Sequence, residues 1–125
     1  MDPIREFLKL QDYSDHVIRD GLEGLVQAWE RTARTVSVEY DGMWEEWLNE
    51  VDGREIIHEV AHLTEGPDHS AFRMRIAKAD ELFKLATEMS ECQWGAENER
   101  EHGWNRDRNW WYYRKPLRPG PHWTT

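Results

Sequence analysis

The residues best suited to chemistry form the string His58-Glu59-Val60-Ala61-His62. On a helix, two His side chains four residues apart point the same way and can hold one zinc ion. The Glu between them can then act as general base on the zinc-bound water. Zinc needs a further protein ligand, and His69 follows seven residues after His62. A catalytic zinc site is therefore one hypothesis for this chain.

Residues 58–73 resemble the active-site helix and following loop of the SprT-like zinc metallopeptidases. The resemblance implies a zinc-dependent hydrolase in which His58, His62 and His69 hold the metal. It also implies that Glu59 is the base.

The sequence departs from that family at two positions, Glu55 and Thr64, where small or apolar residues are usual. These enzymes also lay the active-site helix on a β-sheet, and only one credible strand precedes His58. On a helical wheel, His58 and His62 lie opposite an apolar face formed by Ile56, Val60 and Leu63. A solvated polar face accounts for that pattern as well as a metal site does, so both interpretations stay open.

Two other features could bind a partner. The first is the aromatic segment Trp110-Trp111-Tyr112-Tyr113-Arg114, which could stack nucleobases or grip a proline-rich peptide, although the acidic charge of the chain argues against bases. Large aromatic side chains are costly to leave in water, so closure of the core is the favoured interpretation of this segment. The second feature is a set of acidic residues that could form one face, namely Glu39, Glu45, Glu46 and Glu50.

Charge and composition restrict the class of partner. The net charge is −9 at pH 7, which opposes nucleic-acid binding and suits either a basic protein or solubility alone. Cys92 is the only cysteine, so no intramolecular disulfide can form. No apolar run is long enough to span a membrane, and residues 1–3 lack the basic flank of a secretory signal. We expect a soluble cytoplasmic protein.

Hydrophobic periodicity predicts a mainly α fold, a small bundle of three to four helices. Its clearest helices run from Ser14 or Asp15 to about Thr35 and from Asp68 or Ser70 to about Met89, with a short helix at residues 4–10. Val36 to Tyr40 alternate like a strand, which leaves open one short β-hairpin near 36–47.

The middle of the chain predicts two helices rather than one. Trp44, Trp47, Leu48 and Val51 share one face of a wheel, and the apolar residues after Asp52-Gly53 share nearly the opposite face. We therefore expect a break at Asp52-Gly53, with Glu55 completing a capping box. The 125 residues predict a single domain in which 96–125 are an irregular, aromatic-rich extension packed on the helices.

The overall distribution of aromatic and charged segments between Trp29 and Pro116 is similar to that of an uncharacterised family of small bacterial proteins. This resemblance implies a helical fold without a zinc motif. The leading hypothesis is then a non-enzymatic, acidic protein without a cofactor that binds another protein. The alternative is the zinc peptidase centred on His58, and metal analysis separates the two.

Overall fold

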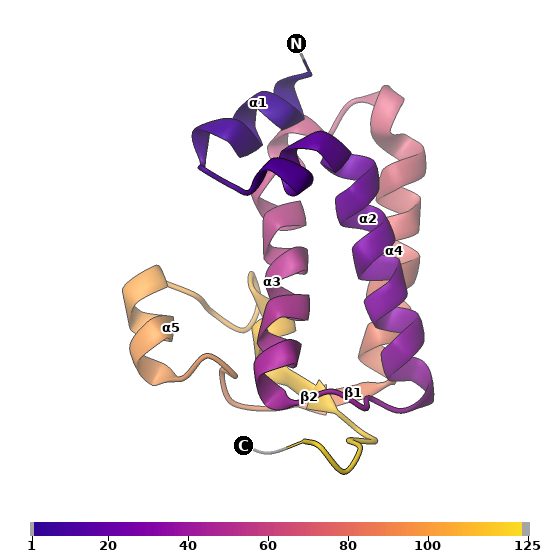
Figure 1. The fold of residues 1–125 in the computed structure, drawn as a ribbon, viewed down its shortest axis with the longest axis vertical. Coiled ribbons are helices and arrows are strands. Elements are labelled where there is room, and N and C mark those ends of the chain that lie inside the picture. The colour runs from indigo at the N-terminus through magenta and orange to yellow at the C-terminus, as the bar shows by residue number, and fades with distance from the viewer. Residues whose placement is uncertain (1, 124–125) are drawn as a thin grey trace.

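The computed structural model describes residues 2–123, and it is mainly α-helical, as predicted (Figure 1). The long helices are α2 (Asp15–Val38), α3 (Trp44–Glu59) and α4 (Ser70–Leu85), preceded by the short helix α1 (Pro3–Leu10). Figure 1 shows the three long helices running nearly parallel or antiparallel to one another. The remaining elements are the short helix α5 (Ala96–His102), the 3-10 turns η1 (Ala61–Leu63), η2 (Pro67–His69) and η3 (Trp110–Tyr113), and the strands β1 (Thr87–Met89) and β2 (Arg114–Pro116).

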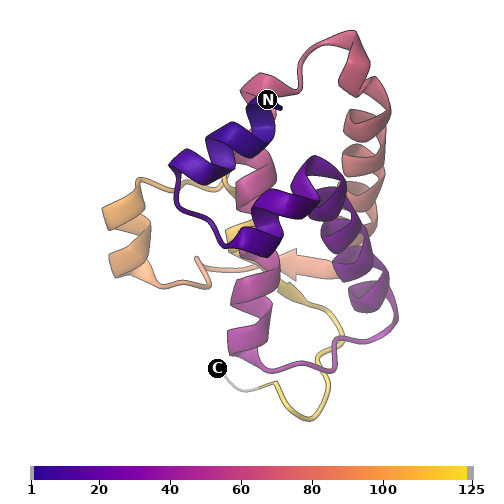
Figure 2. The ribbon, with the colours of Figure 1, turned by 45° about the horizontal axis from the view of Figure 1, so that its top comes forward.

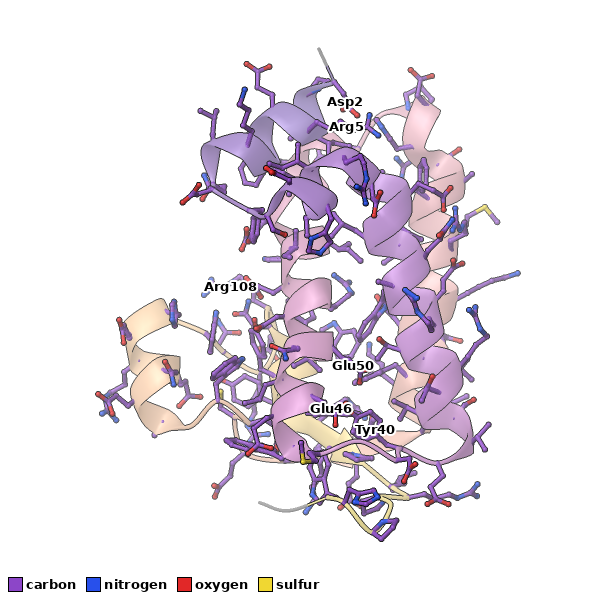
Figure 3. All side chains as sticks on the ribbon, viewed as in Figure 1. Asp2, Arg5, Tyr40, Glu46, Glu50 and Arg108 are labelled. Carbon is purple, nitrogen blue, oxygen red and sulfur yellow. The ribbon has the colours of Figure 1, made fainter. Side chains whose placement is uncertain are left out.

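A kink near the start of α2 lets α1 pack across it (Figure 2). Gly21 has φ +60° and ψ −150°, a backbone conformation that glycine adopts readily. The kink frees carbonyl groups, and the Arg5 side chain donates hydrogen bonds to those of Ile18 and Arg19 at 3.0–3.2 Å. Arg5 is held in turn by Asp2 at 3.0 Å, and Figure 3 shows both residues at the end of the molecule where the chain begins.

The predicted break at Asp52-Gly53 is wrong, because α3 is one continuous helix from Trp44 to Glu59. An amphipathic helix buries one face, but α3 lies between α2 on one side and the C-terminal segment on the other (Figure 1). Both apolar faces are therefore covered. Trp47 and Val51 are fully buried, and Ile57 is only 4% exposed.

The predicted strand at 36–40 and the hairpin near 36–47 are also wrong. Helix α2 continues through Val38, because Val36 extends the buried stripe of Trp29 and Ala33 and packing overrides the β-propensity of the segment. Tyr40 forms only an isolated parallel bridge with Pro119. The antiparallel pair of strands instead joins Thr87–Met89 to Arg114–Pro116, so α4 ends at Leu85 rather than at Met89.

The segment 96–125 is less irregular than predicted, since within its described part residues 96–102 form α5 and 114–116 form β2. Gly103, in the left-handed region at φ +69°, ends α5. The expected packing of the aromatic segment is confirmed, because Trp111 and Tyr112 are each 1% exposed.

Large aromatic side chains form the centre of the core. The Phe83 ring lies 4.7 Å from the Trp29 ring and 5.3 Å from the Trp47 ring, measured between centroids, and Trp110 borders it at 6.0 Å. These four residues come from α2, α3, α4 and η3, so the C-terminal turn completes the same core as the long helices. Within residues 2–123, no helix combines the length and the apolar character needed to cross a lipid bilayer.

Candidate functional site

The structure does not bring the three candidate zinc ligands together. His58 lies in α3, but that helix ends at Glu59, so His62 falls in η1 and loses its helical relation to His58. The His58 ring packs 5.4 Å from Trp111, whereas the His62 ring packs 5.6 Å from Phe7.

His69 lies at the start of α4, with its ring 6.2 Å from that of Phe72. Glu59 accepts a hydrogen bond from the Tyr13 hydroxyl at 2.8 Å. Across residues 2–123, no group of three His, Cys, Asp or Glu side chains is arranged to hold a metal ion.

The aromatic segment predicted to bind a partner is mostly inside the protein. Trp111, Tyr112 and Tyr113 are between 1% and 3% exposed, and Trp110 is half-buried. The main chain of Arg114 accepts a hydrogen bond from the indole N–H of Trp47 at 3.2 Å. Most of this segment therefore closes the core and offers no free surface.

Only some residues of the predicted acidic face lie on the surface. Glu39, Glu45 and Glu46 are exposed, but Glu50 is half-buried and its Oε2 atom has no hydrogen-bond partner. Figure 3 shows Glu50 and Glu46 on α3, with Tyr40, from the connection between α2 and α3, close by.

A different site, which we call the acidic cleft, lies beside α3. Asp52, Glu55 and Glu59 recur at intervals of three and four residues and so share one side of the helix. They line a cavity of about 360 Å³. The rest of the lining comes from Tyr13, Ile56, His102, Trp104 and Tyr112.

Neutral groups hold the three carboxylates in place. Asp52 Oδ1 accepts hydrogen bonds from the Tyr112 hydroxyl at 2.8 Å and from the indole N–H of Trp94 at 3.0 Å. Glu55 Oε1 accepts one from the Asn109 amide at 2.9 Å. None of the three carboxylates forms an ion pair with a Lys or Arg of residues 2–123.

Burial makes negative charge costly in this cleft. It raises the pKa of Asp52 and Glu55, although the hydrogen bonds from Tyr112 and Asn109 act in the opposite direction. Burial and the nearby carboxylates also raise the pKa of Tyr112 far above its usual value, so its hydroxyl stays protonated and remains a donor. Three carboxylates without a Lys or Arg partner among the described residues, in a partly desolvated cavity, favour a positively charged occupant.

Aromatic rings form the rest of the wall beside the carboxylates. The Trp104 ring lies 4.2 Å from that of Tyr112 and stacks on His102 at 4.5 Å, between centroids. Trp104 is half-buried. The Trp104 ring is covered by these two neighbours, so the rings shape the cavity and the carboxylates select a positively charged ligand.

A buried ion pair joins α3 to α4 and sets how α3 is rotated about its axis. Arg54 donates two hydrogen bonds to the two carboxylate oxygens of Asp80, at 2.8 and 2.9 Å, and the indole N–H of Trp29 donates to Oδ1 at 2.8 Å. The Arg54 guanidinium also lies 4.6 Å from the centroid of the Trp111 ring. Together these contacts set the rotation of α3 that exposes Asp52 and Glu55 to the cleft.

The sequence contained part of the signal for this cleft. The three-and-four spacing of acidic residues on α3 was visible, but the predicted helix break assigned Asp52 and Glu55 to a cap. Tyr13 and Trp104 are remote in sequence, and nothing local indicated that they meet at α3. No family model, curated protein or solved structure matches this chain, so both resemblances drawn from the sequence stay predictions.

Proposed function

We propose that this protein binds a basic segment of another protein, and that the acidic cleft receives an arginine or lysine side chain of that segment. The observation that carries the proposal is the set of three carboxylates, Asp52, Glu55 and Glu59, which face an aromatic-walled cavity without a Lys or Arg partner among the described residues.

Arginine is the better fit of the two side chains. Its planar guanidinium can donate parallel hydrogen bonds to a carboxylate and can reach two carboxylates at once, which an ammonium group does less well. These contacts hold the cation without covalent chemistry, so the proposed role is that of a binding protein.

The charge of the whole chain supports the same partner. A net charge of −9 attracts basic partners over a distance set by the ionic strength and raises their rate of encounter. Exposed acidic residues outside the cleft, such as Glu45 and Glu46, would contribute to that attraction rather than to the specific contact.

Calorimetric titration with a pair of peptides tests the proposal. One is a capped Gly/Ser peptide carrying three arginines, and its twin has citrulline at those positions, which keeps the shape and removes the charge. We expect the arginine peptide to bind and the citrulline peptide not to bind. Affinity for the arginine peptide should fall as salt rises.

A double variant, Glu55→Gln with Glu59→Gln, should weaken binding of the arginine peptide at least about tenfold, since charge-assisted hydrogen bonds are worth about 1.5–3 kcal/mol. The matched control is Glu39→Gln with Glu45→Gln, which removes the same charge from exposed positions outside the cleft. Equal weakening in the two double variants, or equal binding of the two peptides, would overturn the proposal.

A further inference from the structure

A second cavity has the opposite charge. It has a volume of about 250 Å³ and shares no lining residue with the acidic cleft. It lies where the end of α4 meets the C-terminal segment. We call it the basic pocket, and its lining residues are Lys84, Met89, Arg106, Asp107, Trp110, Tyr113 and Arg114.

Two of its three cations are held by aromatic rings. The Lys84 ammonium lies 4.4 Å from the centroid of the Trp110 ring, and the Arg106 guanidinium lies 5.1 Å from that of Tyr113. A cation–π contact positions a cation but does not cancel its charge. Both groups therefore remain available to an anion.

The hydrogen bonds of the two arginines also leave their charge unmatched. Arg106 donates from Nη1 to the Ser90 carbonyl at 2.9 Å, and Arg114 donates from Nη1 to oxygens of Lys84 and Thr87 at 3.2–3.4 Å. All of these acceptors are neutral. Within residues 2–123, Lys84, Arg106 and Arg114 form no ion pair with a carboxylate.

Two acidic groups lie near the pocket. Asp107 is part of the lining, and Glu99 accepts a hydrogen bond from the hydroxyl of Tyr113, which also lines the pocket. Counting the lining side chains alone, three cations and one carboxylate leave the pocket with two positive charges. Such a local excess is unusual in a chain whose net charge is −9.

We propose that the basic pocket binds a phosphate group. Phosphate suits several convergent cations because it presents oxygens in more than one direction, and arginine can donate two parallel hydrogen bonds to it. The faces of Trp110 and Tyr113 already carry cations, so the rings are not free to stack on a nucleobase. The ligand we propose is therefore a phosphate group with no base stacked on these rings, either free phosphate or the phosphate of a phosphorylated side chain.

NMR titration of the full chain with inorganic phosphate tests this inference, with sodium chloride at equal ionic strength as reference. We expect saturable shifts of the Trp110 indole N–H signal and of the amides around residues 84, 106 and 113, and no such shifts with chloride. Capped phosphoserine is titrated in parallel. Binding of either phosphate compound supports the site, and the tighter of the two distinguishes a free phosphate from a phosphorylated side chain.

A double variant, Lys84→Gln with Arg106→Gln, should weaken phosphate binding at least about tenfold. Arg114 is left unchanged because it donates to carbonyl groups at the end of α4. The matched control, Lys78→Gln with Arg100→Gln, removes two exposed cations outside the pocket and should bind as the parent does. Shifts that do not saturate, or an equal loss in the control, would overturn the inference. The arginine-peptide experiment uses other residues, so the two proposals can fail separately.

Discussion

At the scale of single residues, Glu50 is an exception to the rule that buried polar atoms find partners. Its Oε2 atom is buried without a hydrogen bond, and burial raises the pKa of the Glu50 carboxyl. The Tyr40 hydroxyl lowers the pKa of Glu50, and like-charge repulsion from Glu46 raises it. A carboxyl whose pKa is higher in the folded than in the unfolded protein binds protons more tightly when folded. Its contribution to stability is therefore complete below the unfolded pKa and is lost as pH rises through the folded pKa.

The first prediction concerns the substitution Glu50→Gln. Removing the charge should raise the free energy of unfolding by about 1 kcal/mol at pH 8, where the parent carries the desolvated carboxylate. The gain should disappear below about pH 4, where the parent residue is protonated too. Urea melts at several pH values measure this. Glu45→Gln, an exposed change on the same helix, serves as control, and a gain that does not depend on pH would refute the explanation.

At the scale of elements, the ion pair of Arg54 and Asp80 joins α3 to α4, and Trp29 adds α2 through its indole N–H. The Arg54 and Asp80 side chains are only 12% and 16% exposed. A buried pair is costly to desolvate, so its net value is small when both partners are present. Removal of one partner is much more damaging, because the other is left charged and unpaired.

The second prediction follows from this pair. Asp80→Ala should lower the free energy of unfolding by about 3–5 kcal/mol, and Asp80→Asn should lower it by less because the amide oxygen can still accept from Trp29. The double variant Arg54→Met with Asp80→Leu should recover most of the loss. Guanidinium melts of the parent, Arg54→Met, Asp80→Leu and the double variant form the cycle. Strictly additive losses would show that the two residues do not act as a pair.

The number of sides on which each helix is covered explains which elements the sequence could predict. Helices α2 and α4 pack mainly through one apolar stripe each, and periodicity identified most of both. Helix α3 is covered on two sides, so its two apolar faces looked like two helices. The alternation at Val36 to Tyr40 was misleading because Val36 completes a helical stripe that begins at Trp29.

The candidate site was less predictable than the helices. A histidine string is a local pattern, but whether its members converge depends on where the helix ends, and α3 ends at Glu59. The acidic cleft and the basic pocket each combine residues from distant parts of the chain. Periodicity describes the face of one element and carries no information about which other element will cover it.

At the scale of the whole molecule, the C-terminal segment is a structural part of the bundle. It contributes Trp111 and Tyr112 to the core and pairs β2 with β1. It also lines both proposed binding sites, through Tyr112 in the acidic cleft and through Trp110 and Arg114 in the basic pocket. Stability and binding are therefore coupled through one stretch of chain.

The third prediction is that a fragment of residues 1–95 does not fold. It would lose the aromatic side chains that cover α3 and one side of Phe83, along with the strand that pairs with β1. We expect low helix content by circular dichroism, no cooperative melt, and aggregation at micromolar concentration. A soluble fragment with the helix content of the parent would show that the long helices are stable without the C-terminal segment.

The hydrogen bond from the Trp47 indole to the Arg114 carbonyl spans 67 positions along the chain, and it has a consequence for biosynthesis. Helices α1 to α4 are synthesised before the turn that covers them. At about 5–20 residues per second, the chain from Leu85 to Pro116 takes a few seconds to make. During that interval the indole N–H of Trp47 has no carbonyl of Arg114 to donate to, so the final packing around Trp47 forms only after the C-terminal segment has been made.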